Sequence, residues 1–342
     1  MLPVAATIAG CSSDTESHTP SDLKSIQFSV TVPKAPRNAV TTETINTFNT
    51  CAFAEDGQLY LSNVEVVKDS ETNQWGYSPT AYWPADGTLN FYSYSPALES
   101  VAIRSAENPD IANFTSPGNI DLLYGVNMNV DGKVEKQVNI NFRHALSQIR
   151  FYIRKQPASE TGKEINVTVN DVKVVNVATA GSFNFPRETT SANPSTDASV
   201  GKWITTTDNG DINILNNTPK AIDDKFAEYN STGNIFGIPQ ELTPTTATET
   251  TYSGSYIKVL CKITDPETGI TLWPSKSDPN YVDDETGGYM VFPLVTDNNN
   301  SWEIGKLYRY NLTIGVPESA GRINFCVTVD EYNDFSDLPL EN

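Results

Sequence analysis

The chain has 342 residues and a formal net charge of -19, from 42 acidic and 23 basic side chains. That length is enough for two domains of ordinary size, and the acidic surface argues against nucleic acid as a partner because it repels phosphate groups. Fifteen Tyr and fourteen Phe, with abundant Thr and Val, favour strands over helices.

Residues 1–11 form a short apolar run with small residues that ends at Cys11, and a polar tether (residues 12–24) follows. This arrangement resembles a bacterial lipoprotein signal, in which the cysteine is acylated and becomes the mature N-terminus. We therefore expect Cys11 to carry lipid, because buried acyl chains tether a soluble body to a membrane. The run is too short to span a bilayer and lacks a basic start, so a chance apolar N-terminus before a cysteine is the alternative.

Alternation of apolar and polar residues predicts a first strand, which the break Pro33–Arg37 ends. Its inward face would hold Ile26, Phe28, Val30 and Val32. The same period predicts further strands in the first half at 46–54, 58–67, 75–83, 88–95, 121–127 and 134–143. In the second half it predicts strands at 148–154, 164–177, 180–186, 234–239, 255–264, 288–295, 306–316 and 322–330. Residues 187–232 are rich in Thr, Asn and Asp and are predicted to be long surface loops.

The apolar side chains of Val138–Phe142 stand at even positions, whereas those of Ile149–Ile153 stand at odd positions. This change of parity implies a bulge, a corner or a domain hinge near His144. This predicts an N-terminal domain at 25–145 and a C-terminal domain at 146–342. Many short strands with turn signals between them indicate an all-β protein of two β-sandwich domains with Greek-key-type antiparallel sheets.

Apart from Cys11, the chain contains Cys51, Cys261 and Cys326, an odd number for a disulfide framework. Cys261 shares a face of its predicted strand with the apolar residues, whereas Cys326 is on the face opposite to them. If both apolar faces point into one core, the two sulfurs point apart. All three are therefore predicted to be free thiols.

The sequence has no zinc-binding spacing of His or Cys, no nucleophile elbow and no phosphate-binding glycine loop. His144 is predicted to be a structural hydrogen-bonding residue, because catalysis would need a partner that the sequence does not identify. We expect no enzymatic activity, no cofactor and no metal. A hydrolase with two close carboxylates is an alternative, since only the fold sets their separation.

Eight segments form an ordered set of motifs. They are Tyr82–Pro84, Leu89–Pro96, Asp121–Gly125, Phe142–Ile149, Ile238–Gln240, Phe292–Leu294, Trp302–Tyr310 and Ile323–Asp334. In this order they resemble the fimbrillin-like (Mfa-like) surface proteins of Bacteroides and its relatives, which are subunits of type V pili. Trp302–Tyr310 carries that family's pattern W-x-x-G-x-x-Y-x-Y, whereas Tyr332 stands where family members more often have Trp. Most of the aromatic residues in these motifs are predicted to pack in the core rather than to bind a ligand.

The resemblance implies transthyretin-like sandwich domains and a non-enzymatic fimbrial subunit or adhesin. It also implies export as a lipoprotein to the outer membrane of a Gram-negative, Bacteroides-like cell. In such pilins a cut after an N-terminal arginine removes the first strand, and a strand of the next subunit fills the groove. Arg37, the only arginine among the first hundred residues, is the candidate cleavage site, and an ordinary loop arginine is the alternative. The partners would be other fimbrial subunits and a glycan or protein on a host or bacterial surface.

The last residues, Phe335–Asn342, are mostly polar and contain Pro339, so they form a poor donor strand. This favours a tip or accessory subunit that accepts a strand and does not supply one. A stand-alone glycan-binding surface lipoprotein that does not polymerise is the alternative. Solvent-facing aromatic pairs would favour that alternative.

Overall fold

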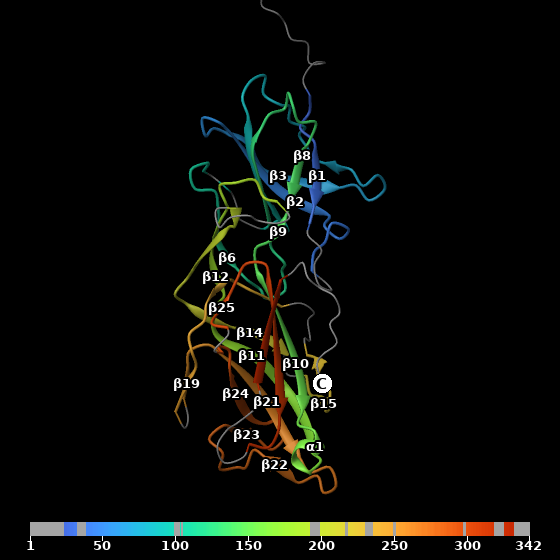
Figure 1. Cartoon of the computed structure of the whole chain (residues 1–342), viewed down its shortest axis with the longest axis vertical. Coiled ribbons are helices and arrows are strands. Elements are labelled where there is room, and N and C mark those ends of the chain that lie inside the picture. Colours follow the sequence, from blue (N-terminus) through green and yellow to red (C-terminus); the bar gives the residue numbers. More distant parts are fainter. Residues whose placement is uncertain are drawn as a thin grey trace, which may run out of the picture.

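The computed structural model describes residues 24–32, 39–98, 103, 105–191, 199–215, 218–229, 235–248, 251–296 and 299–317, with the backbone of 325–331. Cys11, Arg37 and the side chain of Cys326 lie outside these residues. The molecule is elongated, with the blue N-terminal strands at one end and the orange strands of residues 256–293 towards the other (Figure 1). Over the described ranges, no helix is long and apolar enough to cross a membrane.

Three larger sheets hold most of the strands. The six-stranded sheet has the order β4 (Trp75–Gly76), β3 (Leu59–Lys68), β2 (Thr47–Ala54), β5 (Leu89–Ser95), β7 (Leu123–Val130), β9 (Arg143–His144). The seven-stranded sheet has the order β14 (Asn209–Leu215), β11 (Asn166–Ala178), β21 (Tyr256–Thr264), β24 (Gly287–Pro293), β23 (Tyr281–Asp283), with β15 (Lys220–Ile222) beside β11 and β22 (Thr271–Trp273) beside β21. The five-stranded sheet has the order β16 (Ala227–Glu228), β10 (Ser147–Lys155), β26 (Lys306–Ile314), β27 (Phe325–Glu331), with β17 (Ile235–Gly237) beside β10.

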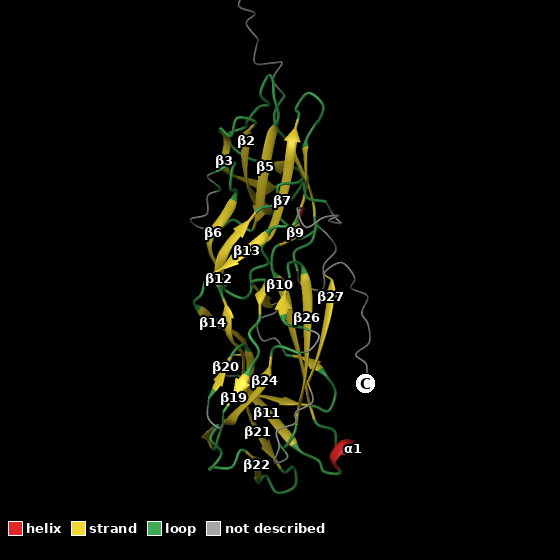
Figure 2. Ribbon diagram, turned by 60° about the vertical axis from the view of Figure 1, so that its left-hand side comes forward, coloured by secondary structure: helices red, strands yellow, loops and turns green. Residues whose placement is uncertain are grey.

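Smaller sheets and one short helix complete the described structure. The pairs are β1 (Phe28–Thr31) with β8 (Val138–Asn141), β18 (Gln240–Glu241) with β25 (Ser301–Trp302), and β19 (Thr246–Ala247) with β20 (Tyr252–Ser253). A three-stranded sheet has the order β13 (Lys202–Thr205), β12 (Ala180–Asn184), β6 (Asp110–Thr115), and the helix is α1 (Ala158–Thr161). Figure 2 shows how completely strands dominate the regular structure, so the prediction of an all-β sandwich-type fold is confirmed.

The pairing is mostly antiparallel, but two pairs differ from the sequence expectation. β1 pairs with β8 in parallel, and β10 pairs with β26 in parallel. Parallel neighbours need a long crossover, and both pairs join segments that are far apart in the sequence. Alternation of apolar and polar residues indicates which face of a strand is buried, but not the direction of the neighbouring strand. The sequence therefore could not predict that these two pairs are parallel.

The change of parity at residues 143–147 is a corner between two sheets. β9 ends the six-stranded sheet at His144, and β10 starts in the five-stranded sheet at Ser147. Ile140 belongs to the core cluster around β1, whereas Ile149 belongs to the core of the C-terminal half. The predicted corner is therefore confirmed.

A third apolar cluster combines early and late parts of the sequence. It packs Tyr92 and Tyr124 of the six-stranded sheet against Phe183 and Phe236. β12 also pairs with β6, although the two strands lie on opposite sides of residue 145 in sequence. The domain boundary at 145 stays a prediction, and any division there crosses this sheet and this cluster.

Two sequence predictions about local structure are wrong. Residues 187–232 are not only surface loops, because β13, β14, β15 and β16 lie there. The buried side chains of β14 are Ile212, Ile214 and Leu215, which is too short an apolar pattern to predict a strand. Its pairing with β11 makes this segment a strand. The predicted strand 75–83 is a strand only at β4, and further along it only Tyr82 forms an isolated bridge, with Ser25.

Three hairpin ends share one local sequence, Asp-x-Glu-Thr followed by Asn or Gly. In each, a carboxylate oxygen of Asp69, Asp265 or Asp283 accepts hydrogen bonds from two backbone N–H groups and from the Thr hydroxyl. These bonds to the ionised form lower the pKa of all three carboxyls. The residue after the Thr has a positive φ each time, which Gly and Asn tolerate.

Cys51 and Cys261 are free and buried, as predicted. Burial raises the pKa of both thiols, because the interior disfavours the thiolate. Cys261 therefore acts as a small apolar group in the core, whereas Cys51 Sγ accepts a hydrogen bond from the N–H of Asn63 at 3.1 Å.

Candidate strand-exchange site

The strand expected to be exchangeable, Ile26–Val32, contains β1, which pairs with a single neighbouring strand. Phe28 faces Val138 and Thr31 faces Asn141, with the two strands running in the same direction. The N–H of Val138 donates to the carbonyl oxygen of Gln27, and the N–H of Phe142 donates to that of Thr31, both at 2.8 Å. In the described part of the chain, β8 is the only strand that pairs with Phe28–Thr31, so β1 is an outer strand (Figure 1).

The inward face of β1 fills the N-terminal core. The side chains of Ile26, Phe28, Val30 and Val32 are exposed by 1%, 5%, 9% and 7%. The ring of Phe28 meets three other rings edge-on, with centroid distances of 5.6 Å to Phe48, 5.5 Å to Tyr77 and 6.0 Å to Phe91. Phe28 is therefore the central apolar anchor of the strand.

The residues just before β1 are held by the segment 77–83. The N–H of Ile26 donates to the carbonyl oxygen of Ala81 at 2.9 Å, and the N–H of Trp83 donates to that of Lys24 at 3.0 Å. The hydroxyl of Tyr77 donates to the carbonyl oxygen of Ile26 at 2.9 Å. Burial raises the pKa of Tyr77, so the phenol remains a hydrogen-bond donor at neutral pH.

The outward face of β1 carries hydroxyl groups that contact asparagines of β8. Ser29 Oγ donates to Asn139 Oδ1, and Thr31 Oγ1 donates to Asn141 Oδ1. Asn141 Nδ2 in turn donates to the carbonyl oxygen of Thr190 at 3.3 Å. This contact fixes the amide of Asn141 from the side away from β1.

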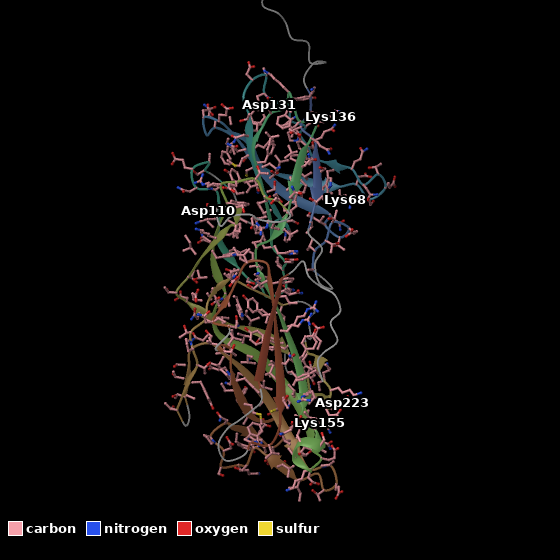
Figure 3. The ribbon with its side chains drawn as sticks, in the orientation of Figure 1. Lys68, Asp110, Asp131, Lys136, Lys155 and Asp223 are labelled. Atoms are coloured by element: carbon pink, nitrogen blue, oxygen red, sulfur yellow. The ribbon has the colours of Figure 1, made fainter. Side chains whose placement is uncertain are left out.

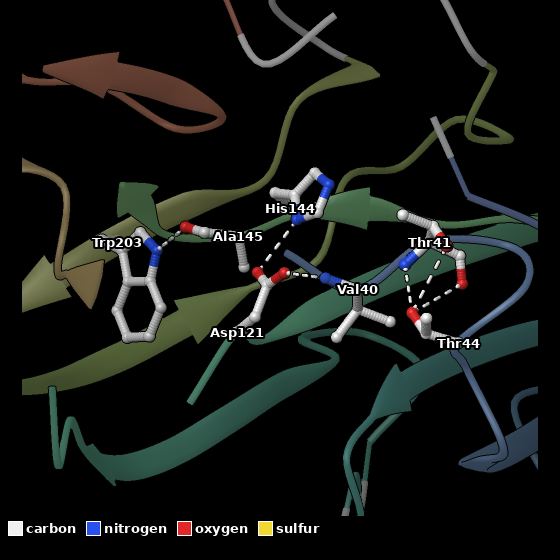
Figure 4. A network of polar contacts seen from close by, with 7 residues as sticks. All are labelled: Val40, Thr41, Thr44, Asp121, His144, Ala145 and Trp203. Atoms are coloured by element: carbon white, nitrogen blue, oxygen red, sulfur yellow. Dashed lines mark hydrogen bonds and ion pairs between the residues drawn. The ribbon is translucent and has the colours of Figure 1, made fainter. Parts of the chain in front are cut away.

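The chain is anchored on both sides of the segment that contains Arg37. Before it, the hydroxyl of Thr42 accepts a hydrogen bond from the N–H of Val32 (2.8 Å) and donates to its carbonyl oxygen (3.0 Å). After it, the N–H of Val40 donates to Asp121 Oδ2 at 2.9 Å. Asp121 Oδ1 lies 2.9 Å from His144 Nδ1, and both side chains are buried (Figure 4). His144 is thus a structural hydrogen-bonding residue, as expected.

The motif Trp302–Tyr310 builds part of the C-terminal core. The indole N–H of Trp302 donates to the hydroxyl of Tyr310 at 2.8 Å, and the N–H of Glu303 donates to the hydroxyl of Tyr308 at 2.8 Å. Gly305 between them has a φ of 67°. All three aromatic side chains are buried, so the prediction that they pack in the core is confirmed.

The part of the chain that the structure describes contains no group of three or more His, Cys, Asp or Glu side chains that could hold a metal ion. Charged side chains are spread along the length of the molecule, as Lys68, Asp131, Lys155 and Asp223 illustrate in Figure 3.

A sequence model of the fimbrillin-like family matches residues 34–330. The chain belongs to the fimbrillin-like family. Among solved structures, it is similar to a candidate cell adhesion protein from Bacteroides uniformis, with 16% identity over 91% of this chain and 99% of that one and a TM-score of 0.49. A fimbrial protein from Bacteroides vulgatus gives 14% identity over 90% and 99%, with a TM-score of 0.49.

The fimbrial anchor protein Mfa2 from Porphyromonas gingivalis gives 8% identity over 90% of this chain and 98% of that one, with a TM-score of 0.33. A search of curated proteins finds no match.

Two motifs of this fimbrillin-like chain meet at the network in Figure 4. Asp121 starts the motif Asp121–Gly125, and His144 lies in the motif Phe142–Ile149. Each motif is visible in the sequence, but their contact is not, since only the folded chain brings them together. The positions of Asn139 and Asn141 give a local signal, because odd positions beside inward-facing Val138 and Ile140 indicate an outward face.

Proposed function

We propose that this fimbrillin-like protein is a non-enzymatic fimbrial subunit or adhesin that joins other subunits by β-strand exchange at β1. The single observation that supports this most is that β1 is an outer strand whose inward side chains fill the N-terminal core. Removing such a strand would expose unpaired backbone groups of β8 and an apolar groove. An extended segment of a partner can fill both.

Cleavage after Arg37 would begin the exchange. The bond of Val40 to Asp121 supports this, because it holds the residues after the cut to the domain without help from β1. The bonds of Val32 to Thr42 cross the cut, so they would still hold β1 after cleavage. Burying four such apolar side chains is worth about 6–10 kcal/mol. Cleavage alone would therefore leave β1 in place, and a strand of similar apolar pattern would be needed to replace it.

An arginine-specific protease tests this step. Cleaved protein should bind a peptide that copies a stalk subunit's donor strand, whereas Arg37→Ala and Arg37→Lys variants should resist the cut at this position and bind no peptide. The lysine variant is the matched control, because it keeps the charge and removes only the cleavage site. Arg37 would be an ordinary loop residue if uncleaved protein bound equally well, or if the cleaved protein unfolded without binding.

We further propose that the protein is exported as a lipoprotein with lipid on Cys11, and that it resides in the outer membrane, on the cell surface or in a pilus. The small residues before Cys11 and the polar tether after it support this assignment. Cys11→Ala should leave the membrane fraction or remain unprocessed, while Ser12→Ala should behave as the wild type. Persistent labelling of Cys11→Ala by a lipid probe would contradict the assignment.

We propose a position at the tip, or as an accessory subunit, because the polar composition of Phe335–Asn342 and Pro339 within it make this segment a poor donor strand. Such a subunit would accept a partner's strand. A fimbria reconstituted from this chain and a stalk subunit should then show this chain at one end or at intervals by immunogold labelling. Continuous labelling along the filament would contradict this position.

A stand-alone glycan-binding protein is the second candidate, and one observation favours it. Tyr60 and Tyr82 are 40% and 44% exposed, and the hydroxyl of Tyr60 donates to the carbonyl oxygen of Tyr82 at 2.6 Å. Exposed aromatic faces of this kind can stack on sugar rings. A glycan-array signal that is lost in Tyr60→Ala and Tyr82→Ala, with no donor-peptide binding after cleavage, would favour this candidate.

A further inference from the structure

We propose that the groove beneath β1 accepts only a strand that runs parallel to β8, with an aromatic anchor in the place of Phe28 and hydrogen-bond donors in the places of Ser29 and Thr31. This inference rests on the proposed strand exchange and defines the chemistry of the incoming segment. The occupant is thus an extended segment of another subunit with a stated pattern, and not any apolar strand.

The direction follows from the backbone groups that β8 offers. The N–H groups of Val138 and Phe142 meet carbonyl oxygens of Gln27 and Thr31 in the evenly spaced pattern of a parallel pair. An antiparallel strand would bond to both groups of one opposite residue at a time. The side chains of an antiparallel strand would therefore be shifted along the groove, away from the positions in the core that the side chains of β1 now occupy.

The aromatic anchor follows from the shape of the core. The three rings around Phe28 belong to β2, β5 and the segment after β4, so they remain when β1 leaves. A smaller apolar side chain at this place would leave a void among them. The other inward places hold aliphatic side chains and are less demanding in shape.

The two outward donors follow from the asparagines of β8. Asn139 Oδ1 and Asn141 Oδ1 accept hydrogen bonds from the hydroxyls of Ser29 and Thr31. Thr190 fixes the amide of Asn141, and Gln137 Nε2 donates to Asn139 Oδ1 at 3.2 Å. Both acceptors are therefore positioned by groups outside β1, and they distinguish a Ser or Thr from an apolar residue on the outward face.

One other segment of the chain has this pattern. Ile323–Val329 reads I-N-F-C-V-T-V, and Ile26–Val32 reads I-Q-F-S-V-T-V. The aromatic residue, the aliphatic residues and the second outward donor are identical, and a cysteine replaces the first donor. A peptide copy of this segment therefore provides a natural probe of the pattern.

The test uses the full chain with a sequence-specific protease site in place of residues 33–37. After cleavage, exchange of the bound β1 fragment is measured with fluorescent peptides, and the uncleaved chain is the control. A copy of Ile26–Val32 should bind, and a copy of Ile323–Val329 should bind within about tenfold of it. Alanine in the place of Phe28 should weaken binding at least about a hundredfold. The reversed sequence should not bind.

Alanine in the places of Ser29 and Thr31 should weaken binding about fivefold each. In a protein with Asn139→Ala, a peptide with alanine in the place of Ser29 should bind as well as the unsubstituted peptide. A peptide with alanine in the place of Thr31 should still bind more weakly, because Asn141 is unchanged. This variant is informative because Asn139 is exposed and its loss leaves the core intact.

The outcomes distinguish a failure of the proposed strand exchange from a failure of the pattern required of the incoming strand. If the copy of Ile26–Val32 does not exchange into the cleaved chain, the groove is not an acceptor and the proposed function fails together with this inference. Strand exchange stands and the proposed pattern is overturned if that copy exchanges but a control peptide binds equally well. The control peptides are the reversed sequence and the peptide with alanine in the places of both Ser29 and Thr31. Failure of the Ile323–Val329 copy to bind would likewise overturn the pattern.

Discussion

Replacing Phe28 by alanine tests whether β1 is an integral part of the N-terminal core. The ring is 5% exposed and meets Phe48, Tyr77 and Phe91 edge-on. Truncating a buried Phe costs about 3–5 kcal/mol in the free energy of unfolding. We expect a value towards the upper end, because Phe48 and Phe91 belong to different paired strands that cannot both close over the void.

Urea unfolding monitored by tryptophan fluorescence measures this loss. Trp75 is a suitable reporter, because its ring centroid lies 5.1 Å from that of Phe48 in the same core. Ser29→Ala is the matched control, since it removes one outward hydrogen bond of the same strand and should cost about 1 kcal/mol or less. A loss below about 1 kcal/mol for Phe28→Ala, or one equal to that of the control, would refute the reasoning.

Three further substitutions test other parts of the structure. Asp121→Ala removes the acceptor of Val40 N–H and the partner of His144 Nδ1 and should lower the free energy of unfolding by about 1–3 kcal/mol, and an unchanged urea midpoint would contradict this. Gly237→Ala places a Cβ 2.7 Å from Trp302 Cζ3 and should cost about 1–3 kcal/mol in thermal unfolding, unless the indole shifts freely. Asp283 has a lowered pKa, so its stabilising effect should be complete above about pH 4 and should fade as the pH falls through the lowered value. Asp283→Asn should therefore show a weaker acid dependence of stability than the wild type, and identical acid profiles would count against the hydrogen-bonded turn.

Much of the strand structure is readable from the sequence because alternation is a local property. Successive side chains of a strand point to opposite faces, so Ile26, Phe28 and Val30 indicate a buried face without reference to any partner. The corner near His144 is readable for the same reason, since a change of parity is visible in the chain itself. The Asp-x-Glu-Thr turns could also have been predicted, because their hydrogen bonds join residues no more than three apart.

The tertiary structure alone decides which segments become neighbours. Nothing near Ser29 in the sequence indicates Asn139, and nothing near Asp121 indicates that it joins Val40 to His144. β14 is a strand because β11 lies beside it, although its own apolar pattern is short. Local alternation determines the buried face of a strand, whereas the partner, the direction and the register depend on contacts between distant residues that form together when the whole core packs.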